Sequence, residues 1–575
     1  MGDDCSEYNS SALVGFWFDD PKVMKIETNR LKILLFLFLA AVFLFSVNQF
    51  KESDSFYHLK VGQVIWETKT VPTHDIFSYT APGAPWVTHE WLAELIFYGM
   101  YVAGGYWGEI VIVALLSVLT YYLAYKIAAA SGVPVFLAAL LTFAFGYLTM
   151  ELWIGRPQIW SYLLVAALLY ALEKYRRNGH KEWLVVSALL VLFWANVHAS
   201  IPLGLAMIFG YFLLAICGRF LPRLFGPAGD WRYLFLLFVV AAGLSLVNPN
   251  TYHVLTYQNA IGGTAHTLQV LEWNSITDFW GKPETKVTII EICASFIFAF
   301  WWFGWRRETR SWHALGMIVV AGVLPFLAIR HAGFWPMLAG PWIVIGLGSA
   351  SKNILERYSA EKTEAVSILI FLVIAAAGVL RLPSGPVNQM LVPEKAVDFI
   401  QSVGPKGPEF NLYNEGGYLI WRLWPQEKVS IDGRSEVYTG ESLENFRKIA
   451  YFQDKDWNKL VDDTYHVQYF VFGYYSPEFT KVLYRLVSRL AKNEWSLVYW
   501  DDAGVVFVRN TPEHQDLIRK YGIHMVSPWR APQDIPPEAR PAAALELRTV
   551  LERDIAAGAS TRILEDYALQ LLPKK

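Results

Sequence analysis

Residues 31–49 read LKILLFLFLAAVFLFSVNQ, a nearly unbroken apolar stretch that carries one charged residue, Lys32. A helix rises about 1.5 Å per residue, so roughly 20 apolar residues cross the hydrocarbon core of a bilayer. The stretch therefore predicts a membrane-spanning helix. About thirty polar or mixed residues precede it and it lacks a small-residue cleavage site, so we interpret it as a retained span rather than a signal peptide.

The composition of the whole chain agrees with a membrane protein. Of its 575 residues, 54% are hydrophobic and only 17% are charged, whereas soluble proteins carry about 25% charge. Aromatic residues make up 16%, as expected where rings settle at membrane–water boundaries. The net charge of −2 argues against nucleic-acid binding. With only three cysteines, we expect neither a disulfide framework nor a zinc cluster.

Further apolar stretches predict about eleven transmembrane helices. Several of them are short, so the count is accurate only to one or two. The predicted spans are 31–49, 107–129, 134–150, 158–173, 183–197, 200–217, 232–247, 287–305, 312–329, 334–349 and 364–380.

Basic residues indicate the orientation of these spans. Clusters of Lys and Arg precede the first span and recur in alternate loops, near residues 174–181, 219–232, 306–310 and 352–357. Such clusters mark cytoplasmic loops. We therefore predict a protein of the cell (inner) membrane with its N-terminus in the cytoplasm and its C-terminal domain outside the cytoplasm.

The chain divides into three predicted parts. Residues 1–383 form the polytopic membrane domain, which includes a long outer loop at 50–106. Residues 384–510 alternate between helical and strand patterns and predict an extracytoplasmic α/β domain with a partly parallel sheet. The expected helices are 393–403, 441–459 and 477–492, and the expected strands are 418–421, 429–432, 467–472, 497–500 and 505–509. Residues 511–575 predict a tail of exposed helices.

The outer loop opens with a candidate catalytic helix. If residues 54–65 are helical, Asp54 and His58 lie on one face with Tyr57, Val61 and Ile65, while Lys60, Gln63 and Glu67 point away. A buried charge is costly unless it is paired or bound to metal. Asp54 is therefore a candidate general base or metal ligand with His58 as its partner, and a purely structural Asp–His pair is the alternative.

Three further groups of polar residues on the outer side are candidates. Glu90 and Glu94 are one helical turn apart and could hold a divalent ion, although a solvated face is the more common arrangement; His74 is a candidate loop contact.

Arg156, Arg330, His331 and His198 lie at span ends, where ionisable residues mark functional sites. Guanidinium groups match phosphate oxygens, so Arg156 and Arg330 are candidates for gripping a phosphate or pyrophosphate. Each arginine could instead snorkel or pair with Glu151 or Glu272.

The C-terminal domain adds Arg434, which follows Asp432-Gly433 at the end of an expected strand. Ligands often sit at strand ends in α/β sheets. Arg434 could reach the site if this domain packs over the outer loop; the alternative is a turn with an Asp–Arg pair that locks the domain to the membrane part.

The order of these motifs resembles a known family. DSFYHLKVGQVIWETKTVPTHDIFSYT (54–80), RPQ (156–158), WANVH (194–198), NPN (248–250), EW (272–273), NEGGYLIWRL (414–423) and IDGRSEVY (431–438) are similar to GT-C-type glycosyltransferase-like membrane proteins. The resemblance covers residues 31–510. The wider superfamily includes oligosaccharyltransferase catalytic subunits and protein O-mannosyltransferases. Asn414 to Tyr418 keeps the Gly-Tyr of the oligosaccharyltransferases but lacks their Trp-Trp-Asp, which weakens the expectation of peptide-sequon recognition.

The resemblance implies sugar transfer from a polyprenyl-phosphate-linked donor on the extracytoplasmic face. It implies catalytic roles for Asp54 and His58, and phosphate binding by Arg156 and Arg330, with His331, His198 and Arg434 as further candidates. A divalent cation, Mg²⁺ or Mn²⁺, would be held by Asp54 and Glu90. The expected partners are the lipid-linked donor, membrane lipids and other membrane subunits, and no nucleic acid.

Two alternative functions remain open at this stage. The chain could be a non-catalytic GT-C-like scaffold or accessory subunit of a larger membrane assembly, with its helical tail as the docking element. A transporter is disfavoured because the sequence shows no inverted repeat and no pair of interrupted helices.

Overall fold

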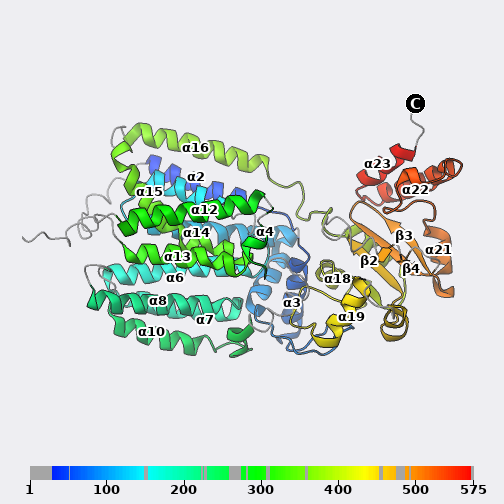
Figure 1. The fold of residues 1–575 in the computed structure, drawn as a ribbon, viewed down its shortest axis with the longest axis horizontal. Helices are drawn as coiled ribbons and strands as arrows, with labels where there is room; N and C mark the ends of the chain where they lie inside the picture. Colours follow the sequence, from blue (N-terminus) through cyan, green and yellow to red (C-terminus); the bar gives the residue numbers. More distant parts are fainter. Residues whose placement is uncertain are drawn as a thin grey trace, which may run out of the picture. The chain divides into compact units, whose positions relative to one another are not determined.

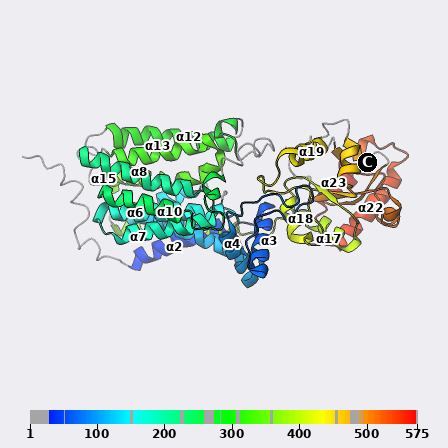
Figure 2. The same cartoon turned by 90° about the horizontal axis from the view of Figure 1, so that it is seen from below.

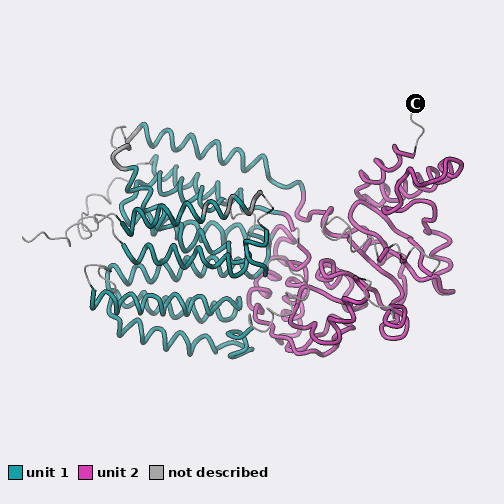
Figure 3. The backbone as a smooth tube through the Cα atoms, viewed as in Figure 1, with its two compact units in different colours: residues 1–48, 108–384 teal, residues 49–107, 385–575 magenta. Residues whose placement is uncertain are grey.

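A computed structural model describes residues 29–571 except 51, 148–152, 222–224, 226–228, 258–272, 280, 282, 306–310, 356–359, 452–456, 474–485, 488 and 491–493. Its contacts divide the chain into two units, coloured separately in Figure 3. Unit 1 is Met1–Asn48 with Gly108–Ser384, and unit 2 is Gln49–Trp107 with Gly385–Lys575. The outer loop that the sequence assigned to the membrane domain thus groups with the C-terminal residues.

All the described secondary-structure elements of unit 1 are helices. The long helix α4 (Trp91–Ala129) consists of two helices joined at Gly104 and Gly105, and the part beyond the kink belongs to this unit. Gly105 has a φ of 59°, a left-handed conformation that favours glycine. The other helices are α2 (Asn29–Ser46), α5 (Val135–Tyr147), α6 (Gln158–Asn178), α7 (Glu182–Val197), α8 (Ile201–Phe220), α10 (Trp231–Leu244), η4 (Ile276–Phe279), α12 (Pro283–Ala299), η5 (Phe300–Trp305), α13 (Trp312–Leu327), η6 (Ile329–Phe334), α14 (Trp335–Leu338), α15 (Gly340–Leu355) and α16 (Ala360–Leu380).

The long helices of unit 1 lie side by side in both views (Figures 1 and 2). Helix α16 packs on α2, α6 on α7, and α8 on α10. Arg381 follows α16 and donates to the carbonyl oxygen of Phe45 in α2 at 3.0 Å, which joins the same ends of these two helices. Large apolar side chains also face outward from the bundle, including Val185, Leu189 and Leu236. An apolar outer surface of this extent suits a lipid environment.

The number of predicted spans is not confirmed. Among the described residues, three helices are long and apolar enough to cross a membrane: Trp91–Ala129, Ile201–Phe220 and Lys362–Leu380. A fourth is added if Ile329–Leu338 and Gly340–Ser351, which meet at a bend of 46°, form one broken span. Five more apolar helices have 10–17 residues. A helix of that length covers roughly 15–26 Å, less than the hydrocarbon thickness of about 30 Å.

Unit 2 combines helices with one small sheet. Its helices are α3 (Asp54–Thr68), the start of α4, α17 (Glu394–Val403), α18 (Gly416–Leu423), α19 (Gly440–Ala450), η7 (Lys459–Thr464), η8 (Pro512–His514), α21 (Gln515–Tyr521), η9 (Pro532–Asp534), α22 (Arg540–Ala556) and α23 (Arg562–Leu571). Its strands are β1 (Glu409–Asn411), β2 (Tyr469–Gly473), β3 (Trp495–Trp500) and β4 (Gly504–Arg509).

The sheet has the strand order β1-β2-β4-β3. β1 pairs with β2 in parallel, with Phe410 opposite Phe470. β4 pairs antiparallel with both β2 and β3. The prediction of a partly parallel sheet is therefore confirmed, and the residues expected at 467–472, 497–500 and 505–509 form strands.

Two of the expected strands are wrong. Residues 418–421 lie within helix α18, where Tyr418, Leu419 and Ile420 are buried. Residues 429–432 form no strand, and only Val429 makes an isolated bridge, to Ser78. A four-residue apolar run has no periodicity that separates a buried strand from one turn of a buried helix. The helix expected at 393–403 is α17, the helix expected at 441–459 begins as α19, and most of 477–492 lies outside the described residues.

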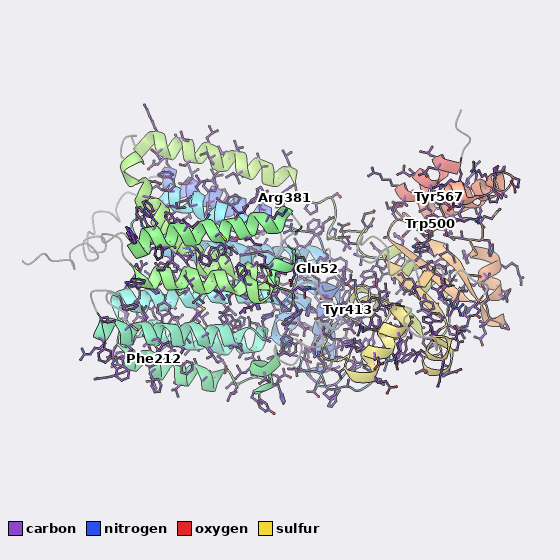
Figure 4. The ribbon with its side chains drawn as sticks, in the orientation of Figure 1. Glu52, Phe212, Arg381, Tyr413, Trp500 and Tyr567 are labelled. Carbon is purple, nitrogen blue, oxygen red and sulfur yellow. The ribbon has the colours of Figure 1, made fainter. Side chains whose placement is uncertain are left out.

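The predicted helical tail is present as α21, α22 and α23. The backbone amides of Arg562 and Ile563, at the start of α23, donate to the buried Asp502 at 2.8 Å each. The ring of Tyr567 lies edge-on to Trp500 of β3 at 5.5 Å, and both side chains are labelled in Figure 4. Helix α23 is thus anchored to the sheet by one carboxylate and one aromatic contact.

Candidate functional site

Helix α3 begins at Asp54, where a carboxylate in the first turn interacts favourably with the positive end of the helix dipole. The prediction that only one face of α3 is buried is wrong for one residue. Lys60 was expected to point away, but only 7% of it is exposed. Its ammonium group lies over the ring of Trp421 at 5.1 Å, and burial lowers the pKa of Lys60, opposed by the charge of Glu67.

The burial of α3 on two sides explains this error. The first turn of α4 approaches one side so closely that a Cβ at Gly62 would lie 2.2 Å from the carbonyl oxygen of Glu94. Helix α18 covers another side, where the rings of Phe56 and Tyr418 meet at 4.8 Å. A helix enclosed in this way buries polar positions that an amphipathic pattern assigns to solvent.

His58 lies in a buried cluster of carboxylates and imidazoles. Its Nδ1 is 2.8 Å from Oε1 of Glu94 and 3.7 Å from Oε2 of Glu90. The other oxygen of Glu90 is 3.4 Å from Nε2 of His89. The side chain of Glu94 is only 2% exposed, so the alternative of a solvated Glu90–Glu94 face is wrong for Glu94.

The charges of this cluster affect His89. Burial disfavours its imidazolium form, but the charge of Glu90, a hydrogen bond to Glu90 and the charge of Glu436 outweigh burial, and the pKa of His89 is raised. The cluster thus carries negative potential. Three of its atoms, His58 Nδ1 and one oxygen each of Glu90 and Glu94, lie within 4.8 Å of one another and could hold a metal ion.

The predicted metal ligands Asp54 and Glu90 are only partly brought together. Glu90 belongs to the three-residue group, and Asp54 does not. Oε2 of Glu94 is buried and has no hydrogen-bond partner among the described residues. A nitrogen and two carboxylates, one of them with an unsatisfied oxygen, is a donor set that fits a divalent cation.

Asp54 itself lies against the IDGR motif. A Cβ at Gly433 would lie 2.1 Å from Oδ1 of Asp54, so only glycine allows this approach. The Gly433 carbonyl oxygen accepts a hydrogen bond from the hydroxyl of Tyr413 at 2.9 Å, a residue labelled in Figure 4. Tyr413 therefore holds this turn in place beside Asp54.

The NEGGY motif contacts the residue before Asp54. The backbone amide of Tyr418 donates to Oγ of Ser53 at 2.8 Å. A Cβ at Gly417 would lie 2.3 Å from the carbonyl oxygen of Ser53. Motifs that are about 360 residues apart in the sequence thus meet at the first turn of α3.

Arg434 is occupied by structural partners. Its Nη2 lies 2.7 Å from Asp75 and 2.6 Å from Asp432, and its Nε donates to Asp432 at 2.8 Å. The guanidinium also lies over the ring of Trp86 at 4.6 Å, and the side chain is 1% exposed. The alternative of a turn with an Asp–Arg pair is what the structure contains, and it links residues 75 and 432 within unit 2.

The phosphate candidates of unit 1 lie at one end of its helices. Nε2 of Gln158, in the RPQ motif, donates to the carbonyl oxygen of Arg330 at 3.2 Å and so brings the segments of Arg156 and Arg330 together. The guanidinium of Arg330 lies over the ring of Trp273 at 4.6 Å. Nδ1 of His331 lies 3.3 Å from the carbonyl oxygen of Leu324.

His198 is placed at the same end. Its Nδ1 contacts Oγ of Ser200 at 2.9 Å, and Ser200 donates to Ser161 in the first turn of α6 at 2.6 Å. The two proposed acidic partners of the arginines, Glu151 and Glu272, lie outside the described residues. His74 makes a loop contact, with its Nδ1 3.0 Å from Oγ1 of Thr73.

Sequence reasoning missed several buried carboxylates, among them Glu109 and Glu415. Glu109 is fully buried, and neither of its oxygens has a hydrogen-bond partner among the described residues. A glutamate inside an apolar run is a signal that could have found it. Glu415, in the NEGGY motif, accepts from the amide of Gly473 at 3.2 Å, and burial raises its pKa to about 8.

Comparison with known proteins identifies the fold. No family model matches the chain, and no curated protein gives a significant sequence match. Among solved structures, the oligosaccharyltransferase AglB from Archaeoglobus fulgidus, in complex with an inhibitory peptide and a dolichol-phosphate, has a TM-score of 0.57 at 10% identity, over 84% of this chain and 74% of that chain. The chain has a GT-C fold.

Two further structures are similar. The same archaeal enzyme in complex with Zn and sulfate has a TM-score of 0.52 at 12% identity, over 94% of this chain and 86% of that chain. ArnT from Cupriavidus metallidurans, bound to undecaprenyl phosphate, has a TM-score of 0.45 at 13% identity, over 84% of this chain and 98% of that chain. The GT-C resemblance predicted from the motifs is confirmed, and the chain is a multi-pass membrane protein.

Proposed function

We propose that this protein is a glycosyltransferase that moves a sugar from a polyprenyl-phosphate-linked donor to an acceptor on the extracytoplasmic face of the cell membrane. The observation that carries the proposal is the GT-C fold over most of the chain, with a carboxylate at the first turn of α3. The neighbour with the highest similarity given above binds a dolichol-phosphate, which supports a lipid-linked donor.

The convergence of motifs on Asp54 supports a catalytic role for this residue. Two glycines, Gly417 and Gly433, allow backbone to approach the first turn of α3, and Tyr413 holds one of the approaching turns. Such close packing fixes the position of Asp54, as catalysis by a positioned group requires. His58 lies one helical turn beyond it on α3.

In the proposed reaction, the acceptor heteroatom forms a bond to the anomeric carbon while the bond from that carbon to the phosphate oxygen breaks. Asp54 receives the acceptor proton as general base or serves as a metal ligand. The polyprenyl phosphate leaves with the electron pair. Arg156 and Arg330 stabilise its negative charge through guanidinium–phosphate hydrogen bonds, with His198 and His331 as supporting groups.

A divalent cation is part of the proposal. When bound, it would supply positive charge next to developing negative charge. The sequence analysis predicted that the cation is Mg²⁺ or Mn²⁺ and that Asp54 and Glu90 are its ligands. Among the described residues, His58, Glu90 and Glu94 have donor atoms that lie close together, and these residues would hold the cation.

A non-catalytic scaffold is the second candidate. The observation that favours it is the pairing of Nη2 and Nε of Arg434 with Asp75 and Asp432, which engages a residue proposed to bind phosphate in structural contacts. In that case the packing around Asp54 would serve only to join segments of unit 2.

The test is sugar transfer by purified protein in lipid vesicles with polyprenyl-phosphate sugars as donors. Asp54→Asn keeps the volume and removes the charge, and should reduce the transfer rate by about 100-fold or more. Arg156→Lys should reduce donor use, because a point charge replaces a two-pronged donor. Glu67→Gln, at an exposed position of the same helix, is the matched control and should retain wild-type transfer.

The scaffold candidate predicts the opposite pattern in cells. Asp54→Asn would then leave the cellular phenotype intact, and deletion of residues 511–575 would abolish it. That result, with both variants expressed at normal levels, would overturn the glycosyltransferase proposal.

The proposed orientation has its own test. A single cysteine introduced at an exposed position of 384–510, such as Lys406, should react with a membrane-impermeant reagent in intact cells. A cysteine at His180, in a basic loop, should be protected. Labelling of His180→Cys with protection of Lys406→Cys would reverse the orientation.

A further inference from the structure

We infer that the tail helices α22 and α23 form a latch, which closes on the sheet when Asp554 takes up a proton and loosens when Asp554 ionises. The inference concerns the conformation of the tail, and it does not depend on sugar transfer. It is carried by the side chains that lie between these two helices and the hairpin of β3 and β4.

The first attachment of the latch is at Asp502, in the turn between β3 and β4. Its carboxylate accepts hydrogen bonds from the backbone amides of Arg562 and Ile563, at the start of α23, at 2.8 Å each. The hydroxyl of Ser560 also donates to this carboxylate, at 2.5 Å. A negative charge at the start of a helix is stabilised by the helix dipole, so this attachment suits an ionised side chain.

The second attachment brings the end of α22 onto β3. Nη1 of Arg553 donates to the carbonyl oxygen of Val498 at 3.3 Å, and its guanidinium lies 5.3 Å from the ring centre of Tyr499. The next residue, Asp554, is 0% exposed. Closing the latch therefore removes a carboxyl group from water.

Asp554 is poorly placed for a negative charge. Its Oδ1 accepts a hydrogen bond from Nε of Arg553 at 2.8 Å, but its Oδ2 is buried without a hydrogen-bond partner among the described residues. It lies in the last turn of α22, where the negative end of the helix dipole disfavours an anion. A buried carboxyl group with an unbonded oxygen costs more free energy when it is ionised than when it is protonated.

The neighbouring charges act in the same direction. Asp501 and Asp502 of the hairpin both act on Asp554 through their charges, and Arg553 opposes them. The hydroxyl of Tyr499 donates to Asp501 at 2.8 Å. If all three aspartates were ionised, the interface would hold three negative charges against one positive charge. Like charges disfavour one another's ionised form, so the interface favours a proton on one aspartate.

The charges of α23 do not change this balance. Helix α22 packs on α23, and the charged residues in the first half of α23 are exposed to solvent, where water screens them. These residues are Arg562, Glu565 and Asp566. The cost of ionising Asp554 is therefore set by its burial, by Arg553 and by the hairpin.

The direction of the pH dependence follows from the two states of the tail. Burial raises the pKa of Asp554 from an ordinary 3.8 to about 6; Arg553 opposes this, and Asp501 and Asp502 add to it. The docked tail thus holds the proton more tightly than a released tail. Docking is strongest below the ordinary pKa and weakens as the pH rises through about 6. With these two values, the docking equilibrium falls about tenfold between about pH 5 and about pH 7.5.

The test is backbone hydrogen exchange of the purified full-length protein in detergent at these two pH values, corrected for the intrinsic exchange rate at each. Exchange within residues 540–571 reports release of the tail, and exchange within β4 reports unfolding of the sheet. We expect the protection of the tail, relative to that of β4, to fall about tenfold at the higher pH. Equal relative protection at the two pH values would overturn the inference.

Matched variants assign the proton. Asp554→Asn keeps the volume and cannot ionise, so its tail should show the same relative protection at both pH values. Glu552→Gln, at a side chain of the same helix that is 66% exposed, is the control and should keep the wild-type pH dependence. An unchanged tenfold dependence in Asp554→Asn would assign the proton to another group and overturn the inference. If Asp554→Asn does not fold, the wild-type comparison at two pH values still decides whether the latch responds to pH.

Discussion

Two buried clusters of charged residues, one in each unit, differ in how fully their carboxylate oxygens are hydrogen-bonded. In unit 1, Glu173 accepts two hydrogen bonds from Arg176 at 2.9 Å, one from Arg177 at 3.3 Å and one from Tyr211 at 2.7 Å. Nε2 of His313 lies a further 3.6 Å away. One carboxylate here is surrounded by donors from several helices.

In unit 2, one of two neighbouring carboxylates, that of Glu94, keeps an oxygen without a hydrogen bond in the described part of the chain. His58 contacts both carboxylates, and His89 contacts that of Glu90. The difference teaches that buried charge alone does not indicate function. A saturated carboxylate joins helices, whereas an unsaturated one has capacity left for a ligand.

Breaking the saturated cluster should have the largest effect on stability. Glu173→Gln leaves Arg176 and Arg177 without a compensating charge in a buried place, which typically costs roughly 3–5 kcal/mol. We expect a large drop in the melting temperature of the detergent-solubilised protein. Glu182→Gln, at a highly exposed side chain near the same helix end, is the control. Equal melting temperatures of the two variants would show that the cluster contributes nothing to stability.

A conservative change at the Arg434 network should have an intermediate effect. Arg434→Lys keeps the charge but loses the paired contacts with Asp432 and the planar stacking on Trp86, at a cost of about 1–3 kcal/mol. Thermal unfolding should report this cost. The same change at the exposed Arg548 should have no measurable effect. If Arg434→Lys leaves stability unchanged but abolishes sugar transfer, Arg434 acts on substrate after all.

The last expected effect, a pH dependence at Glu415, appears only above the ordinary carboxyl range of pH. Burial raises the pKa of Glu415 to about 8 in the folded protein, against an ordinary value near 4.5. Between these pH values the unfolded chain releases the proton and the folded chain retains it, so stability falls as pH rises.

Glu415→Gln cannot ionise. It should therefore melt at a higher temperature than wild type at about pH 8.5 and at the same temperature at about pH 4. Melting curves at both pH values measure this. The exposed Glu513→Gln should follow wild type at each. A melting temperature of Glu415→Gln that equals wild type at high pH would contradict the burial argument.

The sequence by itself determined the membrane class, the GT-C resemblance and most of the strands of the sheet. Long apolar runs have one physical solution, a helix in lipid, because the bilayer leaves backbone groups no other partners. Alternating runs at 467–472 and 505–509 likewise predicted β2 and β4. These elements are predicted by the local spacing of apolar residues along the chain.

The tertiary structure decided which charged residues are available for chemistry. Lys60 and Arg434 look like exposed and phosphate-binding residues in sequence, but aromatic rings and acidic residues from distant segments enclose them. Likewise, Glu94 becomes a ligand candidate only because Gly62 lets α3 approach it and sets His58 beside it. Whether a charge is paired depends on neighbours that are far apart in the sequence, and no local pattern encodes them.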